Sequence, residues 1–509
     1  MGETYNATTD LLERNLAHPD RPAFRQDGRV TTYGALCERA NRAGNALRAL
    51  GVQVEQRVLL CMLDTPDLPA VFWGAMKAGL VPVPVNTLLT TADYDYLLRD
   101  SRARVLVVSA PLLPKLEPAL REQPFLQSVV VAGGPAPGQV ALDDLLAQAR
   151  PELDPAPTSH DDVAFWLYSS GSTGQPKGAI HLHGDLAETA RLYGEGILGL
   201  RPDDVVFSAA KLFFAYGLGN AMTFPFAAGA SSVLLADRPT PQSVVALLQK
   251  EKPTFFFGVP TLFAGMLADS TATDLGGRLR WCVSAGEPLP RDIGLRWRER
   301  HGVDILDGIG STELLHIFLS LRPGDVRYGT TGKPVPGYEI EIVDDQDRPV
   351  KPGEIGELRV SGPSSAVAYW NNREKSLRAF RGRWTYTGDK YLQDADGYYV
   401  YCGRSDDMIK AGGQWVSPAE VESALVAHPS VLEAAVVAHK DENQLDKPKA
   451  FVVLKPGARA TSEELQRFVK ERLAPFKYPR WVEFVEGLPK TATGKIQRFK
   501  LRQRLSAQD

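Results

Sequence analysis

The sequence lacks the features that mark secreted, membrane-spanning and nucleic-acid-binding proteins. Only four cysteines occur in 509 residues, scattered without metal-binding spacing, so we expect reduced thiols. No uninterrupted apolar run is long enough for a transmembrane helix. The 58 basic and 61 acidic residues give a net charge of −3. This balance gives no reason to expect a nucleic acid or an anionic membrane as a partner.

The N-terminal residues also lack targeting signals. They have neither the basic stretch nor the apolar core of a signal peptide. Gly2 invites N-myristoylation, but position six is Asn6 rather than serine or threonine. We therefore expect a cytoplasmic protein, a monomer or homodimer, whose partners are small molecules.

Most of the chain alternates short apolar runs with helical patterns, which predicts an α/β fold. Residues 31–50 predict a helix that begins after a threonine cap and ends at Gly51. The strand–helix–strand order of 58–63, 69–79 and 81–86 predicts a parallel βαβ unit. Further strands are predicted at 104–109, 128–133, 163–169, 205–210, 231–236, 254–259, 280–286 and 303–310.

The pattern changes twice beyond these βα layers. From about residue 325, strand-like runs at 338–344, 355–362 and 397–403 follow one another without helices, which predicts a β-rich subdomain. After Asp406, a module of about one hundred residues combines helices and strands. The predicted domains are 1–405, with the βα layers and the β-rich subdomain, and 406–509, a small mobile α+β domain.

Local signals give more detail at two places. In the C-terminal module, two capping boxes start helices, one from Ser417 to Glu420 and one at 461–464, and 481–489 is predicted to be the last strand. The Pro-rich stretch 134–160 is predicted to be a connector.

Residues 168–178, YSSGSTGQPKG, form the clearest candidate for a phosphate-binding loop. Glycines let the backbone approach a ligand, bare N–H groups suit an anion, and Lys177 adds a positive charge. The loop follows the strand predicted at 163–169, and α/β proteins bind ligands at such strand ends. It is not a Walker A loop, because Gly171 and Gly174 are only three apart. The alternative reading is an ordinary surface loop.

Six separated motifs occur in one order along the chain, at 169–178, 284–290, 308–313, 386–389, 403–413 and 489–495. Together they resemble the adenylate-forming superfamily of acyl- and aryl-CoA ligases, stand-alone adenylation domains and luciferases, over almost the whole chain. Segments 211–230 and 311–320 are most similar to the acid-pocket segments of benzoate-CoA ligases and their ring-hydroxylated relatives. The resemblance implies an AMP-forming acid–thiol ligase that uses ATP, Mg²⁺ and CoA.

The same resemblance implies a nucleotide site. Glu313 would hold Mg²⁺, Thr312 would donate to the α-phosphate, and Asp389 with Arg404 would bind the ribose. The alternatives are a solvated glutamate, a turn aspartate and a surface ion pair. Ile309 stands where many family members have an aromatic residue, so we expect no aromatic stacking on adenine from there. The remaining implied residues are Ser169, Ser170, Gly171, Ser172, Thr173, Gly174 and Lys177 around the phosphates, Ala285, Gly286 and Glu287 beside the adenine, and Asp307 and Gly308.

The C-terminal module would supply the remaining groups. By resemblance, Lys495 bridges the substrate carboxylate and the α-phosphate, a role that suits a flexible cation. Two unlike half-reactions imply that the module rotates, with Asp406 as its hinge. Gly412 and Gly413 would line a tunnel for pantetheine. The alternative readings are a solvated lysine in a basic tail and a turn acid.

The acid pocket would be built mainly from aromatic and apolar residues. Phe214 would be its gate, and core packing is the alternative for such an aromatic run. His316 is either a neutral imidazole near the carboxylate or the ring, or a core histidine. His181 and His183 have the spacing of a metal pair, but no third ligand is evident, so a strand or loop is favoured. The remaining lining residues are Ala215, Tyr216, Gly217 and Ile317.

The sequence leaves the substrate open among related acids. Benzoate is the first expectation, with 4-hydroxybenzoate and aminobenzoate as rivals. A stand-alone aryl adenylation domain that loads a carrier protein is the second class. A non-catalytic nucleotide-binding scaffold would be expected to lack Lys495 or Glu313, and both are present. A luciferase-like oxidase shares the fold, but nothing in the sequence indicates an oxygenation site.

Overall fold

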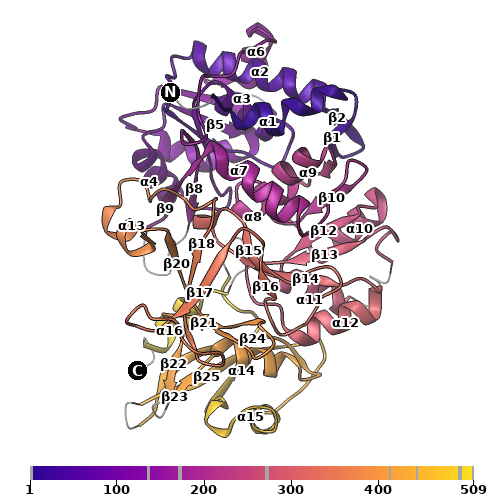
Figure 1. Ribbon diagram of the computed structural model, residues 1–509, viewed down its shortest axis with the longest axis vertical. Coiled ribbons are helices and arrows are strands. Elements are labelled where there is room, and N and C mark those ends of the chain that lie inside the picture. Colours follow the sequence, from indigo (N-terminus) through magenta and orange to yellow (C-terminus); the bar gives the residue numbers. More distant parts are fainter. Residues whose placement is uncertain are drawn as a thin grey trace.

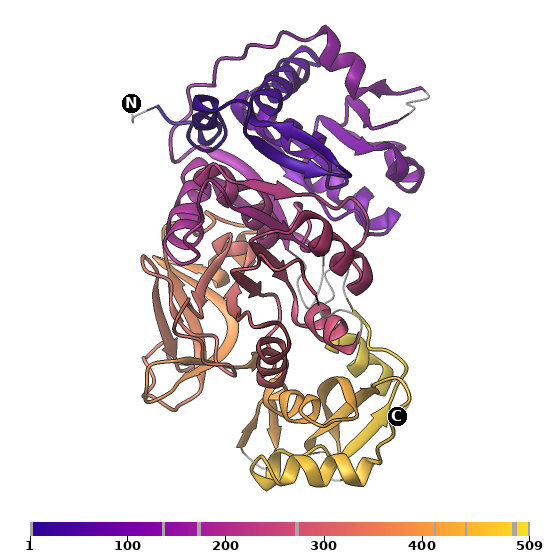
Figure 2. The same ribbon diagram turned by 90° about the vertical axis from the view of Figure 1, so that its right-hand side faces the viewer.

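The polypeptide forms an elongated molecule with the N-terminal layers at one end and the last hundred or so residues at the other (Figure 1; Figure 2). The computed structural model describes residues 4–134, 138–169, 175–269, 274–411, 414–442, 445–490 and 496–506. The predicted site residues that lie outside these ranges are Ser170, Gly171, Ser172, Thr173, Gly174, Gly412, Gly413 and Lys495.

The first layer is a five-stranded parallel sheet in the order β4-β3-β5-β6-β7. Its helix α2 (Tyr33–Ala49) begins as predicted, because the Thr32 side chain accepts a hydrogen bond from the backbone of Ala35. The predicted βαβ unit is confirmed by β3, α3 and β4. The elements are β3 (Arg57–Cys61), α3 (Asp67–Lys77), β4 (Val81–Pro84), α4 (Thr91–Ser101), β5 (Val105–Ser109), β6 (Ser128–Ala132), β7 (Val140–Ala141) and α6 (Leu142–Gln148).

The prediction that 134–160 is only a connector is wrong. The stretch contains β7, which extends the sheet beside β6, and α6, which contacts α2. Leu142 and Leu146 of α6 are buried one helical turn apart. Packing of these two leucines therefore outweighs the loop-like composition of the flanking residues.

The second layer is a nine-stranded sheet in the order β16-β15-β14-β13-β12-β10-β11-β1-β2. The strands from β14 to β1 in this order run parallel, and their centre is made of fully buried Phe255, Phe256 and Phe257. Burial of each ring stabilises the fold by roughly 1.5–3 kcal/mol. The strands are β1 (Pro22–Gln26), β2 (Arg29–Thr32), β10 (Val205–Ser208), β11 (Ser231–Val233), β12 (Phe255–Gly258), β13 (Trp281–Ser284), β14 (Ile305–Gly310), β15 (Ile317–Ser320) and β16 (Lys333–Pro334).

Strand β10 is the topological switch point of this sheet. The chain continues from β10 to β11 on one side and later to β12 on the other. Parallel α/β sheets bind ligands at the carboxyl ends of strands beside such a point. The helices around the sheet are α7 (His183–Thr189), α8 (Ala215–Leu218), α9 (Phe224–Ala228), α10 (Pro241–Glu251), α11 (Pro260–Ala268) and α12 (Arg291–His301), with π-helical turns η4 (Ala190–Glu195) and η5 (Gly219–Thr223).

The predicted β-rich subdomain is an antiparallel sheet in the order β17-β18-β20-β19, with β21 paired to β20. Burial alternates along β18, so one face of the sheet is buried and the other is partly open. Its elements are β17 (Glu339–Val343), β18 (Gly356–Ser361), α13 (Arg373–Ala379), β19 (Phe380–Arg381), β20 (Trp384–Gln393) and β21 (Tyr399–Arg404).

The C-terminal part has a hairpin and a three-stranded sheet of its own. The capping box at Thr461 and Glu464 is confirmed, whereas at Ser417 only the serine half forms. Glu420 does not reach back, because both its carboxylate oxygens accept from Lys477, at 2.8 and 2.7 Å. The elements are β22 (Ile409–Ala411), β23 (Gln414–Val416), α14 (Pro418–Val426), β24 (Val431–Lys440), β25 (Asp446–Leu454), α15 (Ser462–Lys470), β26 (Trp481–Phe484) and α16 (Arg498–Ser506).

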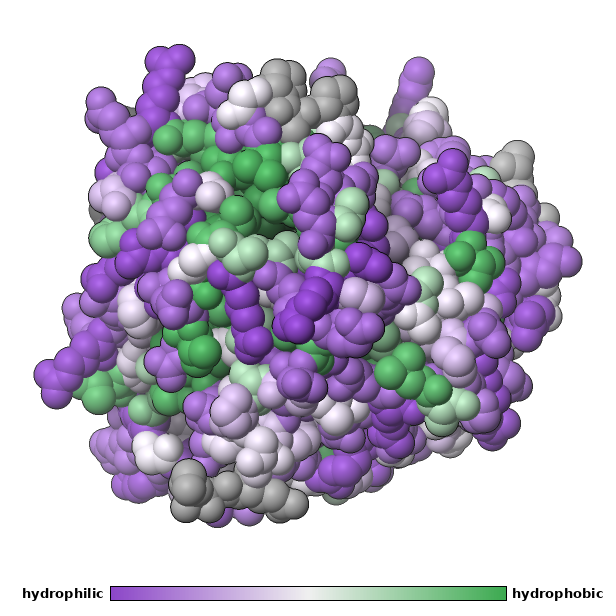
Figure 3. All heavy atoms as spheres, turned by 90° about the horizontal axis from the view of Figure 1, so that it is seen from above, coloured by the Kyte–Doolittle hydropathy of each residue, from purple (hydrophilic) through white to green (hydrophobic). Residues whose placement is uncertain are grey.

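In the part of the chain that the structure describes, no helix is both long and apolar enough to cross a bilayer. The exposed large hydrophobic side chains are far apart in sequence, among them Val30, Val54 and Leu377. Viewed from above, hydrophobic residues gather over one part of this face, with hydrophilic residues around them (Figure 3). The four cysteines are buried and free, as expected.

Candidate active site

Two antiparallel strands hold the ends of the predicted phosphate loop. Strand β8 (Val163–Ser169) leads into it and β9 (Lys177–Leu182) leads out. Ser169 and Lys177 are register partners, so the two ends lie side by side. The residues between 169 and 175 lie outside the described ranges. Each end of the loop carries a residue predicted to bind the nucleotide, Ser169 at one end and Lys177 at the other, and the strand pairing places them side by side.

Glu313 is the centre of a cluster at that place. It lies in a 3₁₀ turn, η6 (Thr312–Leu314), which follows β14 and is capped by the Ser311 side chain. The Ser169 hydroxyl donates to Glu313 Oε1 at 3.2 Å, and Lys177 Nζ lies 4.0 Å from the same oxygen. The Ser169 hydroxyl thus reaches a carboxylate that lies 144 positions later in the sequence.

Tyr369 completes the cluster, and sequence reasoning did not find it. Its hydroxyl donates to Glu313 Oε1 at 2.7 Å and accepts from Lys177 Nζ at 3.2 Å. Lys177 Nζ also lies 4.2 Å from the centre of the Tyr369 ring. Tyr369 follows β18 in the β-rich subdomain, so that subdomain contributes directly to the site.

The cluster favours an ionised Glu313. Burial alone would raise the pKa of Glu313, but the Tyr369 hydrogen bond, the Lys177 charge and further hydrogen bonds lower it below its usual value. Burial lowers the pKa of Lys177, and the Glu313 charge partly offsets this. An ionised carboxylate is a hard oxygen ligand that suits Mg²⁺. No group of three or more histidine, cysteine or acidic side chains that could bind a metal ion occurs within the described ranges.

Asp389 and Arg404 lie opposite each other on β20 and β21. Arg404 Nη1 donates to Asp389 Oδ1 at 3.1 Å and to the Thr387 carbonyl at 2.8 Å. The charge of Asp389 raises the pKa of Arg404 against the effect of burial. Gly388 has φ +73°, and a side chain there would lie 2.9 Å from the Arg404 guanidinium. Gly388, in the 386–389 motif, therefore makes room for this pair.

The predicted adenine segment follows β13. Ala285 is buried, Gly286 has φ +95°, and Glu287 Oε1 accepts a hydrogen bond from the backbone of Ile496 at 2.8 Å. Ile496 directly follows Lys495 in the sequence. The structure therefore brings Ile496, from the C-terminal part of the chain, to the segment predicted to bind adenine.

Asp307 and Gly308 lie on β14, next to β13. The backbone of Leu289 donates to Asp307 Oδ2 at 3.3 Å, and burial raises the pKa of Asp307 to about 8. At neutral pH this carboxyl is therefore mostly uncharged. Ile309, also on β14, is half-buried and presents an aliphatic side chain.

The predicted acid-pocket residues gather at the carboxyl ends of the central strands. Phe214 precedes α8 and is half-buried, and the Tyr216 hydroxyl donates to the carbonyls of Gly258 and Val283, at 3.3 and 3.1 Å. Gly217 admits no side chain, since a Cβ would lie 2.0 Å from the Lys211 carbonyl. Ala215 is half-buried, and Ile317 is buried on β15.

His316 lies in an aromatic environment. The rings of Tyr193, Tyr216 and Phe224 lie 5.5, 5.7 and 4.4 Å from its centre. Burial lowers the pKa of His316 to about 3, so the imidazole is neutral at physiological pH. Its Nε2 lies 3.2 Å from Asn220 Oδ1, so this nitrogen carries the proton.

The histidines at 181 and 183 do not form a metal pair. His183 Nδ1 accepts from the backbone of Ala7 at 3.1 Å, and burial lowers the pKa of His183 to about 4. His181 is buried on β9 and hydrogen-bonds to Asp185 and to the Thr312 carbonyl. Of the two alternatives expected here, a strand or a loop, the structure shows a strand at His181, whereas His183 begins α7.

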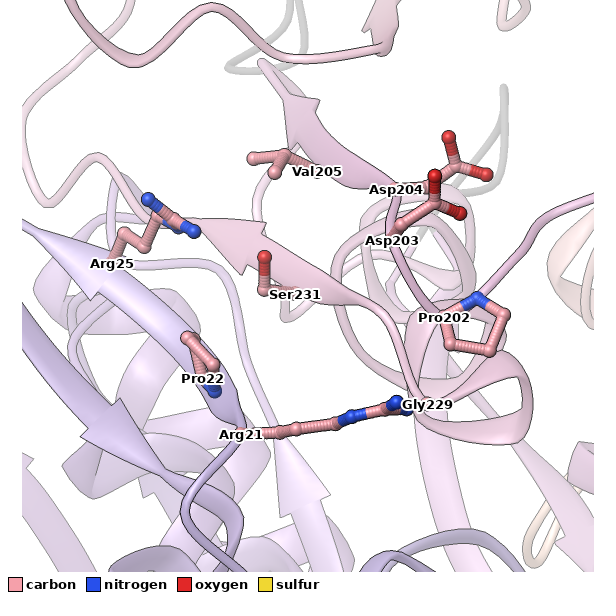
Figure 4. A pocket seen from close by; sticks show the side chains of 9 residues that line it. All are labelled: Arg21, Pro22, Arg25, Pro202, Asp203, Asp204, Val205, Gly229 and Ser231. Carbon is pink, nitrogen blue, oxygen red and sulfur yellow. The ribbon is translucent and has the colours of Figure 1, made fainter. Parts of the chain in front are cut away.

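A separate cavity lies away from this site. It has a volume of about 480 Å³ and lies at the amino ends of β1, β10 and β11 (Figure 4). Arg21 and Arg25 come from the β1 segment, and Asp203 and Asp204 precede β10. None of the predicted site residues lines it. The candidate active site is therefore at the opposite edge of the sheet.

Comparisons with known proteins agree with this geometry. A benzoate–CoA ligase of Thauera aromatica is 58% identical over 508 residues, covering 98% of this chain and 96% of the relative. A crystal structure of a benzoate CoA ligase from Burkholderia xenovorans LB400 is 52% identical, covers 98% of this chain and 100% of its own, and has a TM-score of 0.92. An anthranilate CoA ligase in complex with anthranoyl-AMP is 45% identical, covers 100% and 98%, and has a TM-score of 0.97.

Family comparisons cover both parts of the chain. Residues 12–370 match the AMP-binding enzyme family, and residues 420–495 match the AMP-binding enzyme C-terminal domain. The fold class and the superfamily resemblance predicted from the motifs are thereby confirmed. The chain belongs to the family of AMP-binding enzymes.

Proposed function

We propose that the chain is an ATP-dependent benzoate–CoA ligase. The observation that carries this proposal is that the residues predicted to line the acid pocket do gather around Tyr216 and His316, where aromatic rings surround a neutral imidazole. Such a pocket suits an unsubstituted aryl ring, since binding pockets combine apolar walls with few polar groups. The 58% identity to a benzoate–CoA ligase over nearly the whole chain supports the same substrate.

In the first half-reaction, a carboxylate oxygen of benzoate attacks the α-phosphorus of ATP and pyrophosphate leaves, which gives benzoyl-adenylate. No side-chain nucleophile is needed, so the protein has to neutralise charge and align two anions. We assign the loop with Lys177 to the β- and γ-phosphates, Thr312 to the α-phosphate and Asp389 with Arg404 to the ribose. Lys495 would bridge the two reacting anions.

Glu313 is the residue that would hold Mg²⁺. Its lowered pKa keeps the carboxylate ionised, and Mg²⁺ is commonly held by one or two carboxylates together with substrate phosphates. When bound, the ion supplies positive charge to the phosphate oxygens. Tyr369 and Ser169 orient the carboxylate that receives it.

In the second half-reaction, the CoA thiol attacks the adenylate carbonyl, its proton passes to solvent, and AMP leaves. We propose that the part of the chain from Asp406 onward, the 406–509 domain, rotates about Asp406 between the two half-reactions. Gly412 and Gly413 would then line the pantetheine path, and Phe214 would gate it from the acid pocket.

Substrate choice is tested with a panel of aryl and short alkyl acids, given ATP, Mg²⁺ and CoA. We expect AMP formation with benzoate to exceed that with 4-hydroxybenzoate and aminobenzoates, because a ring hydroxyl or amino group would lose water in a pocket with few polar partners. Release of free benzoyl-CoA separates a ligase from an adenylation domain that loads a carrier protein. Alkyl acids that outperform every benzoate would contradict the proposal.

Replacing Tyr369 with phenylalanine tests the cluster around Glu313. The Tyr369 bond helps hold the pKa of Glu313 down, so in the variant Glu313 protonates at higher pH. Activity that needs the carboxylate is present above its pKa and lost as pH falls, so we expect the acid limb of kcat/KM for ATP to move to higher pH. At neutral pH we expect a loss of about tenfold, as for a hydrogen bond to a charged group.

Tyr398→Phe is the matched control for Tyr369→Phe. Tyr398 also donates to a carboxylate, that of Asp325, but far from the predicted nucleotide residues. It should leave the pH profile of kcat/KM for ATP unchanged. Identical pH profiles for the two variants would show that the Tyr369 hydroxyl does not control the ionisation of Glu313.

A further inference from the structure

A buried pair behind the active site connects the phosphate-loop strand to the Glu313 turn. His181 lies on β9, is fully buried, and has its Nε2 2.7 Å from the carbonyl oxygen of Thr312. Its Nδ1 lies 2.8 Å from Asp185 Oδ2, in the first turn of α7. The Phe165 ring of β8 stacks on the imidazole, with centres 5.2 Å apart. The ring is therefore held on both edges and on one face.

The hydrogen-bond partners fix the direction of each bond. A carbonyl oxygen only accepts, so Nε2 of His181 carries the proton that bonds to Thr312. A proton also lies between Nδ1 and the Asp185 carboxylate, because two lone pairs 2.8 Å apart would repel. Asp185 Oδ2 accepts from the backbone of Leu182 at 3.1 Å as well, which fixes the carboxylate. Asp185 thus orients the imidazole and aims its second donor at Thr312.

The Thr312 carbonyl belongs to the same peptide group as the backbone N–H of Glu313. That N–H is next to the Glu313 carboxylate along the chain and helps to lower the pKa of Glu313. A hydrogen bond accepted by a peptide carbonyl polarises the group and makes its N–H a stronger donor. His181 therefore acts on the Glu313 carboxylate through one peptide bond, without touching it.

We propose that His181, oriented by Asp185, is a positioning residue for adenylation, and that its bond to the Thr312 carbonyl keeps Glu313 aimed at the metal and phosphates. This inference rests on the proposed function. His181 is four residues after Lys177 on the same strand, so β9 carries the loop lysine and also supports the Glu313 turn.

Two substitutions separate the two bonds of His181. The amide nitrogen of glutamine takes the place of imidazole Nε2, so His181→Gln keeps the donor to Thr312. The amide nitrogen of asparagine takes the place of Nδ1, so His181→Asn keeps only the donor to Asp185. In benzoate-dependent ATP–pyrophosphate exchange, we expect His181→Asn to lower kcat/KM for MgATP on the order of 10- to 100-fold. His181→Gln should recover most of that loss.

The second half-reaction is the internal control. Formation of benzoyl-CoA from supplied benzoyl-adenylate does not use the metal–phosphate group, so both variants should keep the wild-type rate. An asparagine variant with the MgATP dependence of the wild type would overturn the inference. Equal losses in both half-reactions, or equal behaviour of the asparagine and glutamine variants, would also overturn it.

Two further outcomes remain distinguishable. If His181→Asn does not fold, as judged by its melting temperature, Asp185→Asn takes its place and should slow adenylation more than thioester formation; equal slowing overturns the inference. If the wild type activates no benzoate but does activate another acid, the proposed function fails. The same comparison is then made with that acid and decides the role of His181 separately.

Discussion

Replacing Lys495 with alanine is expected to lower benzoate-dependent pyrophosphate release by about 10²- to 10³-fold, the usual effect of removing a group that stabilises transition-state charge. The next residue in the sequence, Ile496, donates to Glu287 in the predicted adenine segment. Two anions must meet there, and a flexible cation lowers their repulsion. ATP–pyrophosphate exchange measures the loss.

Thioester formation from supplied benzoyl-adenylate should survive this substitution, because no phosphate is transferred in that step. The matched control is Lys490→Ala. Lys490 belongs to the same motif but pairs with Glu433 at 2.6 Å, within the C-terminal part, and should leave exchange close to wild type. Near-normal pyrophosphate release from Lys495→Ala would contradict the assignment of Lys495 to the adenylation step.

Replacing Glu313 with glutamine is expected to lower kcat/KM for ATP by about 10²-fold or more. The amide keeps the size of the side chain and can still accept from Tyr369 and Ser169, but it loses the charge that suits Mg²⁺. Lys177 also loses the partner whose charge offsets the lowering of its pKa by burial. Both changes weaken the binding of the ATP phosphates. Rates measured over a range of Mg²⁺ concentrations test this.

Glu341→Gln is the control for the Glu313 substitution. Glu341 lies in the β-rich subdomain and bonds to Arg359, so its loss should leave the Mg²⁺ dependence unchanged. A Glu313→Gln enzyme that saturates at the same Mg²⁺ concentration as the wild type would show that the metal is held elsewhere.

Much of the candidate site was predictable because its functional residues lie within short sequence motifs. The strand and loop at 163–178, the turn with Glu313, and the pair Asp389 and Arg404 each lie within a few residues of a glycine or a strand end. Such positions identify residue types that suit phosphate, metal or ribose without knowledge of distant contacts. Their order along the chain then indicates one shared site.

The residues that sequence reasoning missed act through distant partners. Tyr369 meets Glu313 across 56 positions, and His181 meets Thr312 across 131, so neither has a local signal for its role. Helix α16 was not predicted because the tail reads as polar and basic. It is held by buried Leu501 and Leu505 and by an ion pair of Arg498 with Glu422 at 2.7 Å. Tertiary packing decides such elements.

The contact between Ile496 and Glu287 would couple two equilibria, docking of the 406–509 domain and binding of ATP. If the 406–509 domain docks more tightly when the nucleotide segment is ordered, then ATP binds more tightly when that domain is docked, and by the same factor. Saturating ATP would bias the population toward the docked arrangement, and departure of pyrophosphate would release that bias. The timing of the switch between half-reactions would then follow from the occupancy of the phosphate subsites, with no separate trigger.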